Sequence, residues 1–364
     1  MNIRKYHSIL CPDAPVFLQK YLSLPLLTRL KGIGLLCGTD FTALYKNTFF
    51  YSRFDHSLGC ALIAWNFTRD KKQCIASLLH DVSTAVFSHT GDFRKGDTLR
   101  QEVTEGLNES MILNDRELAA LLAQDGLTPQ QVCDYHVYPV CDNEIPALSS
   151  DRLEYMFPSG CALREGKNAK KSGSSAPSSS MDDDYFDMDS IERCYSNITV
   201  LKNEKGIDEL GFTDGDIALE YTRKFLSTAI LLQHNENKLA LNMLGSIMNM
   251  AVQDGVLREV DFMTCSEKQI IIALDTFASK NTDSTLSKMI RTWRQMNHIE
   301  HLEFNPGEGY YSVHLDVKKR WINPLVKTSS GSTERISTLN QQAARLVKEF
   351  LSYRDRAWGA VKLM

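Results

Sequence analysis

The chain has 364 residues, of which 43% are hydrophobic and 24% are charged, and its formal net charge at pH 7 is -4. This composition excludes a wholly disordered, collagen-like or coiled-coil chain, and the charge excludes a protein that binds nucleic acid mainly through a global positive field. The longest apolar stretches fall far short of the roughly 18 to 20 residues that cross a bilayer, so we expect no transmembrane helix.

The cysteines and the first residues indicate a compartment. Nine cysteines are present without a Cys-x-x-Cys pair, which is typical of reduced, buried thiols and not of a disulfide or zinc framework. The apolar segment of a secretory signal is missing from the first residues, because Cys11, Pro12 and Asp13 interrupt it. We therefore expect a cytoplasmic protein.

A first informative helix is predicted over about residues 55–68. Leu58, Leu62 and Trp65 recur there at intervals of four and three residues, which is the period of one helix face. His56 then lies in the first turn of this helix.

A second helix is predicted to follow directly. Asp70 and Gln73 have the spacing of a capping box, and the apolar face after them runs into His80 and Asp81. These two residues are therefore expected at the end of a helix. Further helices are expected near residues 17–31, 99–113, 115–124, 128–135, 215–233, 237–253, 258–262, 266–278 and 337–353.

The composition changes twice later in the chain. A Ser-, Gly- and Lys-rich stretch followed by an acidic run predicts a flexible insertion over residues 164–190. Residues 299–304 and 310–317 flank an Asn-Pro-Gly turn signal and predict a β-hairpin. We therefore divide the chain into a core with the chemistry (1–163), the insertion (164–190), a helical continuation (191–298), and a β-hairpin with a final helix (299–364).

Within residues 1–163, histidines and aspartates recur in an order that is typical of a metal site. His56 is followed by His80 and Asp81, and imidazole nitrogen with carboxylate oxygen suits a divalent first-row metal. Asp151 is the best candidate for a fourth ligand, because it stands in the first turn of another predicted helix.

In this pattern the sequence resembles the HD-domain phosphohydrolases, whose metal signature is H…HD…D. Within that superfamily it is most similar to the SAM-and-HD-domain dNTP triphosphohydrolases and the bacterial dGTP triphosphohydrolases. The resemblance covers residues 20–160 well and the remainder loosely. It implies a mainly α fold: an HD-domain helical bundle with a helical C-terminal extension.

The resemblance also implies roles for single residues. His56, His80, Asp81 and Asp151 would hold the metal. The remaining matched positions are Arg53 for a substrate phosphate, His89 and Asp92 on the catalytic side, and Arg152 and Tyr155 near the substrate.

Two departures from the family pattern bear on the mechanism. Thr84 stands where these triphosphohydrolases usually carry another histidine, and Gln101 with Glu102 replaces their His-Glu motif. Glutamine cannot transfer a proton near neutral pH. Either His89, Asp92 or Glu105 takes over this step, or the reaction differs from triphosphate release.

We therefore expect a phosphohydrolase that acts on a nucleotide, with a dNTP as one candidate, or on a related phosphate ester through metal-activated water. The metal would be Mn, Fe, Mg, Co, Ni or Zn. The alternatives are a phosphodiesterase acting on a cyclic nucleotide or short oligonucleotide, and a catalytically degenerate protein that binds a nucleotide or a partner as a regulator. No membrane is expected as a partner, extended nucleic acid is disfavoured but not excluded, and a homo-oligomer remains open.

Overall fold

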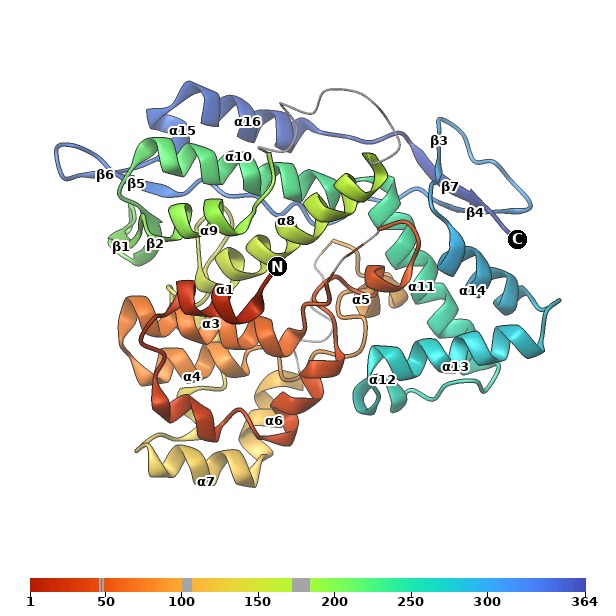
Figure 1. The fold of residues 1–364 in the computed structure, drawn as a ribbon, viewed down its shortest axis with the longest axis horizontal. Helices are drawn as coiled ribbons and strands as arrows, with labels where there is room; N and C mark the ends of the chain where they lie inside the picture. Colours follow the sequence, from red (N-terminus) through yellow and green to blue (C-terminus); the bar gives the residue numbers. More distant parts are fainter. Residues whose placement is uncertain (46, 48, 100–106, 172–183) are drawn as a thin grey trace.

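The computed structural model describes residues 1–45, 47, 49–99, 107–171 and 184–364. It confirms the mainly α fold predicted from the sequence (Figure 1). The α-helices are α1 (Ile3–Leu10), α2 (Pro25–Thr28), α3 (Arg53–Thr68), α4 (Lys71–Leu79), α5 (Thr90–Arg94), α6 (Asn108–Asn114), α7 (Arg116–Gln124), α8 (Ser150–Lys171), α9 (Met188–Tyr195), α10 (Gly215–Leu231), α11 (Asn235–Gln253), α12 (Asp261–Thr264), α13 (Glu267–Lys280), α14 (Thr285–Gln295), α15 (Ile336–Leu339) and α16 (Gln341–Ser352). None of the described helices is long and apolar enough to cross a membrane.

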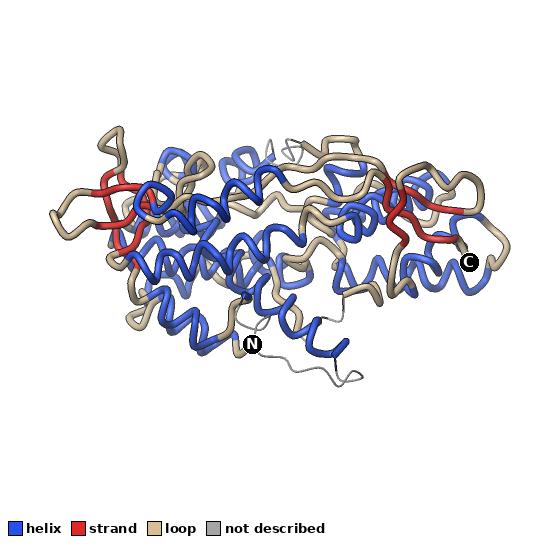
Figure 2. The backbone as a smooth tube through the Cα atoms, turned by 90° about the horizontal axis from the view of Figure 1, so that it is seen from above, coloured by secondary structure: helices blue, strands red, loops and turns tan. Residues whose placement is uncertain are grey.

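The strands form two small sheets, which lie at opposite ends of the molecule (Figure 2). One sheet has the order β1-β2-β5-β6 and the other has the order β3-β7-β4. The strands are β1 (Ile198–Lys202), β2 (Asp208–Phe212), β3 (Glu300–Leu302), β4 (Tyr310–Val313), β5 (Leu325–Lys327), β6 (Thr333–Arg335) and β7 (Trp358–Lys362).

The predicted β-hairpin after residue 299 is wrong in its pairing. β3 and β4 form where strands were expected, but both pair antiparallel with β7 at the C-terminal end of the described chain. β7 therefore lies between them, and the local turn signal does not bring the two strands together. A partner so distant in the sequence leaves no local pattern.

In the core of the N-terminal half, α3 packs against both α4 and α8. α3 begins where Ser52 and Asp55 form a reciprocal capping box, with the Asp55 N–H donating to Ser52 Oγ at 3.1 Å. α4 begins at the N-cap residue Asp70, whose side chain accepts from the Lys72 N–H at 2.8 Å. Both helices therefore start close to where the sequence predicts them.

Two predicted helices are broken into shorter pieces. Over residues 17–31 the chain forms two 3₁₀ turns around α2, because Pro25 has no N–H and starts a new helix. Over 128–135 it forms only the 3₁₀ turns Pro129–Gln131 and Tyr135–Val137. α1, α5, α9 and α14 were not predicted.

The predicted insertion of residues 164–190 contains helix at both ends. α8 continues to Lys171 and α9 begins at Met188, where Asp187 caps it. Residues 172–183 lie outside the described part of the chain.

Candidate metal centre

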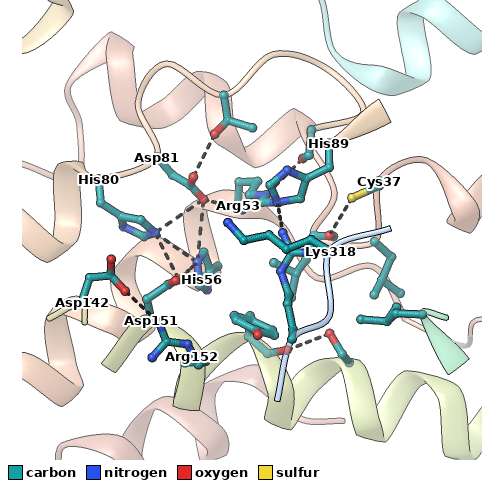
Figure 3. Close-up of a pocket in the computed structure, with 18 of the residues that line it drawn as sticks. Cys37, Arg53, His56, His80, Asp81, His89, Asp142, Asp151, Arg152 and Lys318 are labelled. Atoms are coloured by element: carbon teal, nitrogen blue, oxygen red, sulfur yellow. Dashed lines mark hydrogen bonds and ion pairs between the residues drawn. The ribbon is translucent and has the colours of Figure 1, made fainter. Parts of the chain in front are cut away.

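Four side chains from three helices converge on one point (Figure 3). His56 lies in the first turn of α3, His80 is the C-cap residue of α4 with Asp81 directly after it, and Asp151 lies in the first turn of α8. His56 Nε2 is 3.2 Å from His80 Nε2 and 3.1 Å from Asp151 Oδ1. Asp81 Oδ2 is 3.8 Å from His56 Nε2 and 3.7 Å from His80 Nε2. The structure thus brings together the four predicted metal ligands.

The protonation of the two imidazoles fits a cation between them. His56 Nδ1 lies 2.5 Å from a carboxylate oxygen of Glu154, and His80 Nδ1 lies 2.7 Å from the carbonyl oxygen of Ser77. Both partners are acceptors, so each Nδ1 carries the hydrogen and each Nε2 offers a lone pair. Two such lone pairs 3.2 Å apart repel each other unless a positive charge lies between them. The donor set therefore fits a divalent metal held by two nitrogens and carboxylate oxygen.

Both aspartates are suited to bind as carboxylates. Burial alone would raise the pKa of Asp81, but the charge of Arg53 beside it holds this pKa well below its usual value. Burial also acts to raise the pKa of Asp151, but the neighbouring imidazoles of His56 and His80 hold it well below its usual value. The two ligand oxygens therefore stay charged near neutral pH.

Cys60 is a further group near the centre. It lies one helical turn after His56, and its Sγ is 3.7 Å from His56 Nδ1. Burial raises the pKa of this thiol. A neutral thiol is a weak ligand, because the thiolate is the form that binds metals, so Asp81 is the better fourth donor.

Glu154 supports His56 and was not predicted from the sequence. Its side chain is fully buried, and its carboxylate accepts from His56 Nδ1 and from the hydroxyl of Tyr51, each at 2.5 Å. Gly59 makes room for it, since a Cβ there would overlap the Glu154 carboxylate. The signal available in the sequence was its position three residues after Asp151, on the same face of α8.

The predicted phosphate contact Arg53 is fixed beside the metal ligands. It is 8% exposed, and its Nη1 donates to Asp81 Oδ2 at 2.8 Å while its Nε donates to Ser88 Oγ at 3.1 Å. Thr84, the departure from the family histidine, donates to Asp81 Oδ1 at 2.9 Å. Asp81 is therefore oriented from both sides.

His89 and Asp92 form a hydrogen-bonded pair on the same wall. His89 Nδ1 is 2.9 Å from Asp92 Oδ2, and Asp92 is fully buried at the start of α5. Burial lowers the pKa of His89 from its usual value, and the positive charges of Arg320 and Arg53 lower it further. His89 is therefore neutral near pH 7, with the hydrogen on Nδ1 and a lone pair on Nε2.

The remaining predicted residues differ in their surroundings. Arg152 lines the pocket, but its Nη1 and Nη2 donate to Asn143 and to the loop that holds it, and it pairs with Asp142 at 3.3 Å. Tyr155 also lines the pocket, and burial raises its pKa. Glu105, with Gln101 and Glu102, lies outside the described residues.

The metal ligands form one end of a pocket of about 820 Å³. Its walls combine the polar groups above with apolar side chains from α10 and α11, among them Leu231 and Leu241. Lys318 and Arg320, from the segment that follows β4, also line it. In the sequence these two residues belong to a basic run whose continuation to Leu325 fits the triphosphohydrolase branch, but neither residue was assigned a role in the site.

A second cluster of metal-ligand residue types lies near β3. His301 Nε2 is 3.1 Å from Glu236 Oε1, and His301 Nδ1 is 3.3 Å from Asp355 Oδ1. Each ring nitrogen thus faces its own carboxylate, which is the arrangement of an imidazole bridging two acceptors. The convergence of lone pairs seen at His56 and His80 is missing from this cluster.

No protein-family model matches the chain. In sequence, the chain is 25% identical over 203 residues to the metal-dependent phosphohydrolase cns2 of Cordyceps militaris, which covers 55% of this chain and 51% of that protein. It is 29% identical over 128 residues to the uncharacterized protein YdhJ of Bacillus subtilis, covering 35% of this chain and 38% of that protein. The matches therefore span about half or less of these curated relatives.

Solved structures share the fold over nearly the whole chain. A phosphohydrolase from Bacteroides thetaiotaomicron matches with a TM-score of 0.61 and 14% identity, covering 97% of this chain and 96% of that one. A hypothetical protein from Aquifex aeolicus matches with a TM-score of 0.56 and 16% identity, covering 96% and 93%. Together with the similarity to cns2, the shared fold supports the resemblance to the HD-domain superfamily. The dNTP triphosphohydrolase branch stays a prediction.

Proposed function

We propose that this chain is a metal-dependent phosphohydrolase that acts on a nucleotide or a related phosphate ester. The observation that carries the proposal is the pair of imidazole Nε2 atoms 3.2 Å apart, flanked by the carboxylates of Asp81 and Asp151. The similarity to a metal-dependent phosphohydrolase supports the general activity. The proposal that the substrate is a nucleotide rests on the resemblance in sequence and on the size of the pocket.

The roles of the residues follow from their positions. A divalent metal bound by His56, His80, Asp81 and Asp151 would polarise a phosphate oxygen and lower the pKa of a water. Arg53 lies against Asp81 and offsets negative charge that develops on the phosphoryl group.

We assign proton transfer to His89, which lines the same pocket as the metal ligands. His89, held by Asp92, accepts a proton at Nε2 from the attacking water, because its Nδ1 is already committed to the carboxylate. Arg152 and Tyr155 are proposed to contact the rest of the substrate, and Glu105 remains a proposed substitute for the missing histidine.

Metal analysis coupled to a substrate panel tests this proposal. Purified protein is analysed for bound metal and then incubated with nucleoside mono-, di- and triphosphates and with cyclic nucleotides. Phosphate, pyrophosphate and triphosphate are measured separately. We expect about one metal per chain and release of one of these products, and a metal-free protein without turnover on any substrate would contradict the proposal.

One observation favours a second candidate, a metal-bound regulator without turnover. Thr84 stands where related triphosphohydrolases carry histidine, and it is engaged in a hydrogen bond to Asp81. Such a protein would retain metal and bind nucleotide in the same panel, but release no product.

A further inference from the structure

A chain of hydrogen bonds leads from the metal ligand His56 away from the pocket. Glu154, whose carboxylate accepts from His56 Nδ1, accepts a second hydrogen bond from the hydroxyl of Tyr51 at 2.5 Å. Beyond Tyr51 lies His7, in the last turn of α1, with its Nε2 3.3 Å from the Tyr51 hydroxyl oxygen. Tyr51 therefore lies between a helix near the start of the chain and the carboxylate that supports the metal ligand.

The direction of these hydrogen bonds follows from the acceptors. His7 Nε2 also lies 3.2 Å from the main-chain carbonyl oxygen of Asp55, which can only accept. Burial lowers the pKa of His7, so its ring is neutral near pH 7 and carries its one hydrogen at Nε2. Burial raises the pKa of Tyr51, so the phenol keeps its hydrogen. The Tyr51 oxygen therefore accepts from His7, and the Tyr51 hydrogen is directed at Glu154.

Glu154 depends on this hydrogen bond for its charge. Its side chain is fully buried, and within the described part of the chain no lysine or arginine forms an ion pair with it. Its two carboxylate oxygens are held instead by one hydrogen bond each, from His56 and from Tyr51. A buried carboxylate without a cation needs such donors, because burial removes the water that would otherwise solvate its charge.

We infer that Tyr51 is a positioning residue for the metal centre: by holding the Glu154 carboxylate, it fixes the ring of His56 and the strength of His56 Nε2 as a ligand. Tyr51 does not belong to the residues that line the pocket, so it acts on the metal only through Glu154. A carboxylate that is itself held in place orients the imidazole it accepts from. This inference rests on the proposed metal-dependent function and adds a residue to the groups that support the metal.

Metal affinity and the spectrum of the bound metal test this inference together. The wild type, Tyr51→Phe, Glu154→Gln and the double variant are loaded with Co²⁺. The dissociation constant is measured by competition with a chelator, and the visible absorption bands report the ligand field at the metal. Tyr21→Phe is the matched control, because the Tyr21 hydroxyl donates to a carboxylate oxygen of Asp125 at the same distance of 2.5 Å, and neither residue lines the pocket.

We expect Tyr51→Phe to weaken Co²⁺ binding about 10-fold and to shift the absorption bands, because the Glu154 carboxylate loses the donor that holds it. In the Glu154→Gln background the same change should weaken binding by less than about 2-fold, since no buried charge remains to be stabilised. Tyr21→Phe should be less stable in urea but should keep the affinity and the spectrum of the wild type.

Three results would overturn the inference in different ways. If Tyr51→Phe binds Co²⁺ with the affinity and the spectrum of the wild type, Tyr51 does not position His56. If the loss is equally large in the Glu154→Gln background, or if Tyr21→Phe causes the same loss, the effect does not pass through the Glu154 carboxylate. If the wild-type chain binds no Co²⁺, the proposed function fails and this inference fails with it.

Discussion

At the scale of single residues, the site depends on how each imidazole is held. His56 Nδ1 is bound by the buried Glu154 carboxylate, whereas His80 Nδ1 is bound by a main-chain carbonyl. A carboxylate partner fixes the ring and raises the basicity of the opposite nitrogen. His56 should therefore be the stronger of the two nitrogen ligands, and its strength should depend on Glu154.

Removing a ligand should abolish metal binding without unfolding the chain. His80→Ala or Asp81→Ala deletes a donor atom at the pocket surface and removes little core volume. We expect both variants to lose metal and hydrolysis while the far-ultraviolet circular dichroism stays helical. His298→Ala, an exposed histidine outside the site, is the control. Full metal occupancy in His80→Ala and Asp81→Ala would refute the assignment of the ligands.

Removing the negative charge of Glu154, which lies behind His56, should lower the metal affinity less than removing a ligand does. In Glu154→Gln the amide oxygen still accepts from His56 Nδ1, but the negative charge is lost. We expect the metal affinity to fall about 10- to 100-fold, as is typical when such a supporting carboxylate is changed. The affinity is measured by competition with a chelator, and Glu192→Gln, on the exposed face of α9, should bind metal like the wild type. Equal affinity in Glu154→Gln would show that the carboxylate does not tune His56.

At the scale of elements, α13 holds the turn that carries the catalytic wall. Phe87 and Ser88 have φ values of 63° and 47°, a conformation that costs energy for residues with a side chain. Glu267, fully buried at the start of α13, accepts the Phe87 N–H at 2.8 Å. The strained turn in front of His89 is thus stabilised from the C-terminal half of the chain.

The buried carboxyl of Glu267 should make the stability of the chain depend on pH. Burial raises the pKa of Glu267 to about 8, so the carboxyl is protonated in the fold at pH values where the unfolded chain is ionised. The protonated carboxyl contributes its full share to the free energy of unfolding below about pH 4.5, and this contribution is lost as the pH rises through about 8. Each unit of difference between the folded and unfolded pKa corresponds to about 1.4 kcal/mol.

Glu267→Gln should remove this dependence, because glutamine keeps the acceptor for Phe87 and does not titrate. Urea unfolding between about pH 6 and about pH 8.5 should show a smaller loss of stability in this variant than in the wild type. Glu308→Gln, in an exposed turn, should follow the wild type. Parallel pH profiles for wild type and Glu267→Gln would mean that Glu267 is not protonated in the fold.

At the scale of the whole molecule, local signals predicted helices and ligands but not the long-range pairings. The capping residues Ser52 and Asp70 mark the starts of α3 and α4, and these helices carry His56 and His80 to the site. Glu154, Lys318 and Arg320 reach the site through packing between distant segments, for which the sequence has no periodic pattern. The same reason explains why β7 was missed as the partner of β3 and β4.

We propose that one divalent metal is bound by His56, His80, Asp81 and Asp151. A crystal structure of the metal-loaded chain, with anomalous data collected at the absorption edge of the metal, tests it most directly. We expect one strong anomalous peak within bonding distance of the two Nε2 atoms and of both aspartates, with no bond to Cys60 Sγ. A peak only at the cluster of Glu236, His301 and Asp355, or no peak in a loaded crystal, would contradict it.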